Sequence, residues 1–127
     1  MKYSVDKQEK YCIVVLHEEK LDTTLAPKLK SELITLHAKG VKNIILDMSE
    51  VKYTDSSGLS SLLVGNRIMQ EEGGSFILAS LTDHVNKLIK ISQLDNVLTI
   101  LPTKEEAVDY VFMNEIENDL NSGENLN

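Results

Sequence analysis

Runs of apolar residues along the chain predict five β-strands. Two of them open the chain as a hairpin, because Tyr3 and Val5 alternate with polar neighbours and an apolar, β-branched run follows at 11–16. Apolar runs without alternation are typical of strands that are covered on both faces of a sheet. Two further runs of this kind lie at 41–48 and 75–79, and a short strand is predicted at 97–101.

Between these runs the spacing of apolar residues changes to that of helices, and four helices are predicted. The first has leucines three or four positions apart from Leu25 to Leu36 and ends at Gly40. Helix-capping residues mark where the others begin. These three helices are expected to start near Ser56, Thr82 and Thr103.

Strands that alternate with helices imply parallel pairing, with one antiparallel strand supplied by the opening hairpin. We therefore expect a single α/β domain over residues 1–113, with a mixed, mostly parallel sheet of about five strands and about four helices. Residues 114–127 contain four acidic residues, no basic ones and no sustained apolar face. We expect the last helix to run at most a turn into this segment and the rest to be a disordered, acidic tail that folding does not need.

The net charge of the chain limits the classes of partner that it is expected to bind. The chain of 127 residues has 20 acidic and 13 basic residues, for a net charge of −7, and Arg67 is its one arginine. This balance argues against nucleic acid or an anionic membrane surface as the main partner, because both attract clustered lysine and arginine. The opening residues lack a signal-peptide core and no apolar run is long enough to span a bilayer, so a cytoplasmic protein is expected.

Signatures of catalysis and metal binding are missing. Cys12 is the one cysteine, which excludes an internal disulfide, and its apolar surroundings predict a buried structural thiol. His37 and His84 lie on predicted helices without a second ligand one turn away, so surface histidines are expected rather than metal ligands. No phosphate loop, HExxH or GxSxG motif occurs. We expect neither an enzyme nor a bound cofactor or metal.

The segment 53–62 differs from the rest of the chain. It follows the predicted strand at 41–48 and opens a helix with two adjacent hydroxyls, on Ser56 and Ser57. Free backbone N–H groups and the positive end of the helix dipole make such a place favourable for a phosphate. Simple capping of the helix by Asp55 or by one of the serines explains the same residues.

The run DSSGL at 55–59, after the strand IILDMS, resembles the signature of the STAS domain (sulphate transporter and anti-sigma factor antagonist). The Leu21-Asp22 pair before the first helix resembles the loop after the family's second strand. The glycine pair before FILAS and the stretch at 85–94 also agree in register with the family. The resemblance covers about residues 2–113 and departs at Glu19, where the family often has glycine.

For a single-domain member, the resemblance implies an anti-sigma factor antagonist that works by partner exchange. The unphosphorylated antagonist binds an anti-sigma factor, which is a serine kinase, and thereby frees the sigma factor. The kinase phosphorylates the second serine of the signature, Ser57 here, and a metal-dependent serine phosphatase removes the phosphate. ATP and magnesium then belong to the partners. A phosphate would add about −1.5 to −2 charges beside Asp55 and Asp22.

The expected partner surface joins the signature to the loop before the first helix. Both segments follow the C-terminal end of a strand, so both should emerge at the same end of a parallel sheet. The residues of this surface are Leu21, Asp22, Thr23, Thr24, Thr54, Asp55, Ser56, Ser57, Gly58, Leu59, Ser60 and Ser61.

Two other classes of function are open at this point. A receiver-like phosphoaspartate domain could gather Glu18, Glu19 and Asp47 around magnesium, although the gap between them is short for that fold and no lysine ends the last strand. Alternatively, a STAS-type accessory subunit of a lipid-transport complex, or a stressosome-like scaffold, would bind a partner without needing phosphorylation.

Overall fold

A mixed five-stranded sheet forms the centre of the molecule, in the order β1-β2-β4-β6-β7. The structure is a computed structural model that describes residues 1–125, with side chains through residue 121. β1 pairs antiparallel with β2, and every other neighbouring pair is parallel. The predicted sheet and its opening hairpin are therefore confirmed. The strands are β1 (Tyr3–Lys7), β2 (Cys12–Leu16), β4 (Asn43–Asp47), β6 (Ser75–Ala79) and β7 (Thr99–Leu101).

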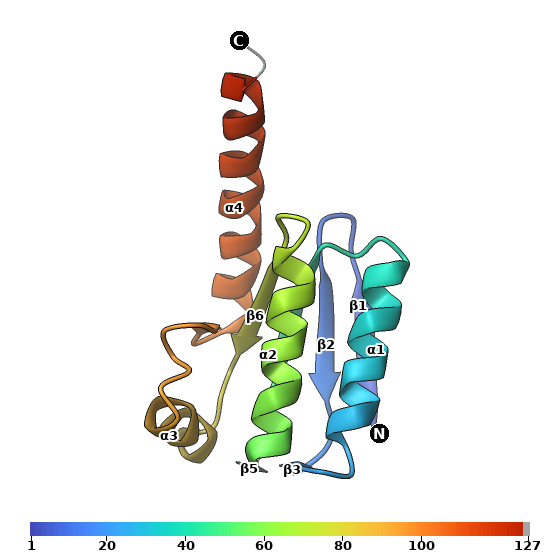
Figure 1. Ribbon diagram of the computed structural model, residues 1–127, viewed down its shortest axis with the longest axis vertical. Coiled ribbons are helices and arrows are strands. Elements are labelled where there is room, and N and C mark those ends of the chain that lie inside the picture. Colours follow the sequence, from blue (N-terminus) through green and yellow to red (C-terminus); the bar gives the residue numbers. More distant parts are fainter. Residues whose placement is uncertain (126–127) are drawn as a thin grey trace.

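Helices cover both faces of the sheet (Figure 1). Within residues 1–125 there are four: α1 (Ala26–Ala38), α2 (Ser56–Gln70), α3 (Asp83–Ile91) and α4 (Lys104–Asn125). α1 and α2 lie side by side on one face, and α4 lies against the other. The starts that the capping residues predict are confirmed by the observed bounds.

Packing explains why the central strands carry no polar alternation. Ile44 and Leu46 of β4 point into a large core beneath α1, α2 and α3, whereas Ile45 joins a smaller core beneath α4. β4 and β6 are consequently buried at every position. Cys12 of β2 is fully buried in the larger core, and this burial raises the pKa of its thiol. The prediction that Cys12 is buried is confirmed.

A second, two-stranded sheet lies at one end of the molecule and positions the loops of interest. β3 (Lys20–Leu21) pairs in parallel with β5 (Tyr53–Thr54). Each strand is two residues long, too short to leave a periodic pattern in the sequence, so the sequence did not predict this sheet. It joins the segment before α1 to the segment before α2.

The last helix is longer than the sequence predicts. α4 starts after Thr103, whose Oγ1 accepts a hydrogen bond from the N–H of Glu106 at 3.1 Å, and it continues through Asn125. This differs from the expected disordered tail over 114–127, of which residues 126 and 127 lie outside the described part. Figure 1 shows the end of α4 extending past the edge of the sheet.

Polar side chains attach the middle of α4 to the domain, which accounts for this difference. The buried Asn43 donates from Nδ2 to Glu115 Oε1 at 2.7 Å. Asn114 donates to Ser75 Oγ at 3.1 Å, and Asn118 donates to the carbonyl oxygen of Gly73 at 2.9 Å. An apolar periodicity cannot reveal contacts of this kind.

Candidate partner-binding site

The start of α2 is fixed by Asp55. This residue is the N-cap, in an extended conformation, and its Oδ1 accepts a hydrogen bond from the N–H of Gly58 at 2.9 Å. The capping interpretation therefore holds for Asp55, whereas Ser56 and Ser57 are the first two residues of the helix itself. Ser56 is exposed and Ser57 is half-buried. Neither serine hydroxyl is therefore needed to cap the helix.

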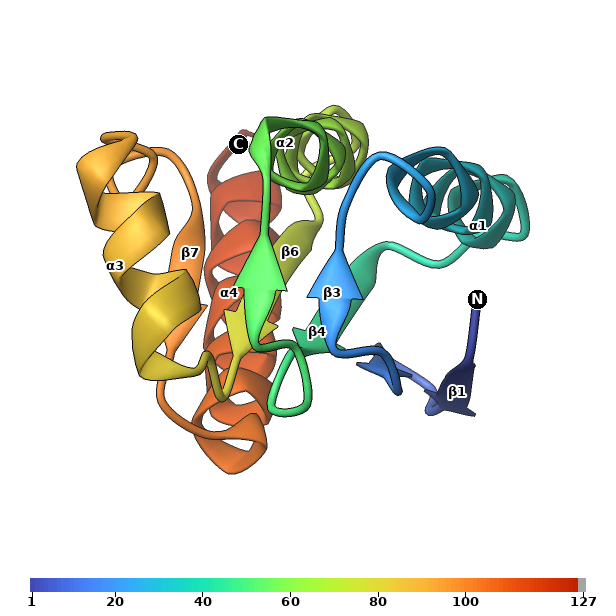
Figure 2. The same cartoon turned by 90° about the horizontal axis from the view of Figure 1, so that it is seen from below.

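Thr23 links the loop before α1 to the signature. Its hydroxyl donates to Asp55 Oδ2 at 3.3 Å and lies 3.3 Å from the Oγ of Ser57. Seen from below, β3 and β5 lie side by side and lead into α1 and α2 (Figure 2). The structure thus places both segments at one end of the molecule, with Ser57 where they meet.

Asp22 shapes the loop before α1. Its Oδ1 accepts hydrogen bonds from the N–H and the hydroxyl of Thr24, at 3.1 and 2.5 Å. The bond from the Thr24 hydroxyl is the main cause that lowers the pKa of Asp22 below its ordinary value of 3.8. The carbonyl oxygen of Asp22 also accepts from the N–H groups of Leu25 and Ala26, where α1 begins. This loop therefore presents a fixed negative charge at neutral pH.

Four of the expected surface residues are buried, namely Leu21, Thr54, Gly58 and Ser61. Thr54 donates its hydroxyl to the carbonyl oxygen of Leu21 at 2.9 Å, and Ser61 donates to that of Gly58 at 2.6 Å. These residues cannot contact a partner directly, and they position those that can. The accessible residues of the set, which we call the signature surface, are Asp22, Thr23, Thr24, Asp55, Ser56, Ser57, Leu59 and Ser60.

Gly58 is required by its neighbours rather than by a special backbone angle. A Cβ at this position would lie 2.0 Å from Thr54 Oγ1 and 2.3 Å from the carbonyl oxygen of Leu21. The glycine therefore lets the start of α2 lie directly against the strand that precedes α1. The position of Ser57 beside Thr23 depends on this close approach.

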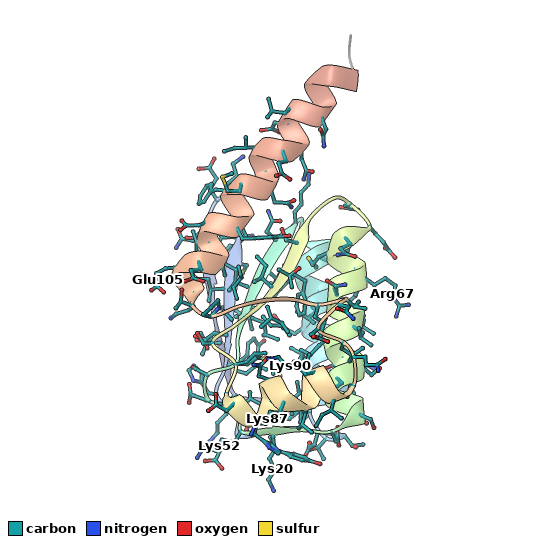
Figure 3. All side chains as sticks on the ribbon, turned by 90° about the vertical axis from the view of Figure 1, so that its left-hand side faces the viewer. Lys20, Lys52, Arg67, Lys87, Lys90 and Glu105 are labelled. Atoms are coloured by element: carbon teal, nitrogen blue, oxygen red, sulfur yellow. The ribbon has the colours of Figure 1, made fainter. Side chains whose placement is uncertain are left out.

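Basic and aromatic side chains surround the signature surface, and no sequence pattern predicts them there. Lys20, Lys52 and Lys87 lie at this end of the molecule (Figure 3), and they come from three separate segments. The half-exposed ring of Tyr53 stacks on the ring of His84, with centroids 6.2 Å apart. No local sequence signal joins these residues, because the tertiary fold alone brings their segments together.

The acidic residues of the receiver-like interpretation do not form a metal site. Glu19 pairs with Lys52 at 3.2 Å, and Asp47 pairs with Lys104 at 3.7 Å. Glu18 accepts a hydrogen bond from a backbone N–H near the N-terminus. Across the described residues, no three histidine, cysteine or acidic side chains are arranged to hold a metal ion. In this same part of the chain, no helix is both long and apolar enough to cross a bilayer.

A family model for the STAS domain matches residues 2–107. The chain belongs to the STAS domain family. It is 28% identical to the anti-sigma-B factor antagonist of Bacillus subtilis over 109 residues, which cover 85% of this chain and 99% of that protein. The family assignment made from DSSGL and the Leu21-Asp22 pair is therefore confirmed.

Solved STAS structures share the fold. An anti-sigma factor antagonist from Mycobacterium paratuberculosis matches with a TM-score of 0.77 and 21% identity, over 87% of this chain and 92% of that one. The phosphorylated form of the Bacillus cell fate determinant SpoIIAA matches with a TM-score of 0.66 and 23% identity, over 87% and 99% of the two chains. At these identities the likeness concerns the fold alone.

Proposed function

We propose that this STAS domain is an anti-sigma factor antagonist that works as a phosphorylation-controlled partner switch. In the unphosphorylated state it binds an anti-sigma factor that is also a serine kinase, and this binding releases a sigma factor. Support comes from its similarity to the anti-sigma-B factor antagonist of Bacillus subtilis along nearly the whole of that protein. Such a role would place the protein in the cytoplasm.

We assign Ser57 as the residue that the kinase phosphorylates. The observation that carries this assignment is its position, half-buried at the start of α2 with Oγ 3.3 Å from the hydroxyl of Thr23. A group added to Ser57 would therefore meet both loops of the signature surface at once. Its neighbour Ser56 is exposed, and in the described part of the chain the Ser56 hydroxyl makes no hydrogen bond to the loop before α1.

A phosphate on Ser57 would change the charge of the signature surface without disturbing the buried residues beneath it. It would add about −1.5 to −2 charges next to the carboxylate of Asp55, on the side where Asp22 is already ionised. The buried residues Leu21, Thr54 and Gly58 lie beneath the surface and would keep their contacts. Phosphorylation would therefore penalise a partner surface matched to a neutral serine without unfolding the domain.

The remaining parts of the cycle come from other proteins. A metal-dependent serine phosphatase would remove the phosphate and restore binding. ATP and magnesium would be held by the kinase, so this chain would need no cofactor of its own.

The proposal is tested by incubating the purified chain with an anti-sigma-type serine kinase from the same genome and Mg-ATP. We expect complex formation before phosphorylation, one added phosphate by intact-mass measurement, and a phosphopeptide that maps to Ser57. Ser57→Ala should bind the kinase and remain unmodified, whereas Ser56→Ala should still be phosphorylated.

A phosphate on Ser56 alone would overturn the assignment of Ser57. Stable binding without any phosphorylation, in the test tube and in native protein, would overturn the switch. That second result would favour the accessory or scaffold role.

A further inference from the structure

The outer side of α4 carries an apolar stripe that the domain covers only in part, at Phe112, whose ring meets the ring of Tyr11 edge-on with centroids 6.1 Å apart. Phe112, Met113, Ile116 and Leu120 form it, with 46%, 59%, 52% and 63% of their surfaces exposed. Phe112, Ile116 and Leu120 are four residues apart and Met113 lies about 100° from Phe112, so all four fall on one side of the helix. Ala107 and Val111, on the inner side, are buried against the sheet. We call the four exposed residues the outer stripe.

Acidic residues border the outer stripe. From 105 to 121 every charged residue is acidic, six in all. At about 100° per residue, Glu117 and Asp119 fall on opposite sides of the stripe, and Asp109 precedes it on the same side of the helix. Glu105, labelled in Figure 3, lies at the start of α4. The stripe is therefore flanked on its own helix by carboxylates, whereas the nearby lysines of the domain (Lys7, Lys10, Lys39 and Lys42) line a cavity beside Glu115.

The end of α4 gains little stability from its own sequence. A basic side chain in the last turn of a helix is favourable against the helix dipole, and the last turn of α4 contains none. The end of this helix extends past the sheet (Figure 1), and short helices without packing are marginal in water. A partner that covered the outer stripe would therefore also stabilise the helix that presents it.

We propose that the outer stripe is a docking surface for a basic amphipathic segment of another protein. The apolar face of that segment would cover Phe112, Ile116 and Leu120, and its lysines or arginines would pair with the flanking carboxylates. Charge decides between the possible occupants. A second copy of α4 would set acid against acid, and anionic lipids would be repelled in the same way.

This surface is separate from the signature surface. α4 packs on the face of the sheet opposite α2, and the outer stripe lies beyond residue 107, where the family match ends. In Figure 1 the free end of α4 lies at the opposite end of the molecule from β3 and β5. Both surfaces can therefore be occupied at once, and this inference does not depend on the phosphorylation of Ser57.

The test uses a synthetic helical peptide with leucines on one face and lysines along both flanks, labelled for fluorescence anisotropy. We expect it to bind the full chain at low salt and to bind more weakly as salt is raised. Ile116→Ser/Leu120→Ser removes apolar surface without changing charge and should weaken binding at least about tenfold. The matched control Ile34→Ser/Val97→Ser alters side chains that are 52% and 51% exposed elsewhere and should bind as the unmodified chain does.

A second peptide and a further variant serve as controls. A peptide with glutamates in place of the lysines should not bind, and Ser57→Ala should bind the lysine peptide normally. Circular dichroism checks that each variant keeps its helices. Undiminished binding by Ile116→Ser/Leu120→Ser would overturn the proposal. Two other results would also overturn it. If the unmodified chain bound anionic vesicles and Ile116→Ser/Leu120→Ser did not, the occupant would be a membrane. If the unmodified chain self-associated in sedimentation and this variant did not, the occupant would be a second copy.

Discussion

The hydroxyl of Thr23 lies 3.3 Å from the hydroxyl of Ser57, although the two residues are 34 positions apart in the chain. This contact joins the loop before α1 to the start of α2, and Thr23 also donates to the carboxylate of Asp55. A group added to Ser57 would therefore contact both the loop before α1 and the start of α2. The first prediction follows from this geometry.

Replacing Ser57 with aspartate should weaken binding to the proposed kinase partner. The added carboxylate would lie beside Asp55 and in reach of the loop that carries the ionised Asp22. One carboxylate has less charge and fewer acceptor oxygens than a phosphate, so the effect should be smaller than that of phosphorylation. Calorimetric titration at low and high salt measures it, and the loss should shrink at high salt.

The matched control is Ser56→Asp, which adds the same charge at the exposed neighbouring position. We expect a smaller loss of affinity for this variant, because Ser56 does not face Thr23. If Ser57→Asp bound as well as the unmodified chain at low salt, repulsion would be excluded. Steric exclusion by the bulkier phosphate would then be the explanation left.

The second prediction concerns Gly58. Gly58→Ala should lower the free energy of unfolding by about 3 kcal/mol, the upper range for overpacking, because its Cβ would meet Thr54 Oγ1 and the backbone of Leu21. Gly40→Ala is the control, since a Cβ there would have no neighbour within 4 Å and only its positive φ would oppose the change. Chemical denaturation of both variants gives the comparison. Equal losses would contradict the close approach at Gly58.

The third prediction concerns the titration of Asp22. Because its pKa is lowered in the folded state, mainly by the Thr24 hydroxyl, Asp22 stabilises the fold above its unfolded pKa, near 3.8. This contribution is lost as the pH falls through the folded pKa. An NMR titration of the Asp22 carboxyl should show a midpoint below 3.8, and Thr24→Val should raise it. An unchanged midpoint in Thr24→Val would refute the assigned cause.

The fourth prediction concerns residues 114–127. Truncation after Met113 removes the hydrogen bonds that Asn114 and Asn118 donate to the domain and the one that Glu115 accepts from Asn43. We now expect it to cost about 1–3 kcal/mol in the free energy of unfolding, where the sequence alone predicted almost none. Truncation after Leu120 keeps these bonds and should cost little. Equal stability of both truncated chains and the full chain would show that the contacts of residues 114–118 contribute nothing.

Local pattern was enough for much of the architecture. The unbroken apolar runs at β4 and β6 show strands buried on both faces, and the leucines of α1 mark a helix with one buried side. These signals are strong because burial imposes a period on the sequence itself. The short motif at the start of α2 identified the family, and with it the end of the sheet at which the candidate site lies.

Features that depend on distant pairs were decided by the tertiary structure alone. Thr82 is the N-cap residue of α3, as the sequence predicts, yet its hydroxyl makes no cap hydrogen bond and donates to the carbonyl oxygen of Val51 instead. The sequence placed Leu21, Thr54, Gly58 and Ser61 on a surface, whereas packing against one another buries them. The sequence predicted a tail where α4 ends, because single polar contacts such as that of Glu115 with Asn43 produce no periodic pattern of apolar residues. Periodicity reports how each segment meets the core, and only the folded chain determines which segments meet each other.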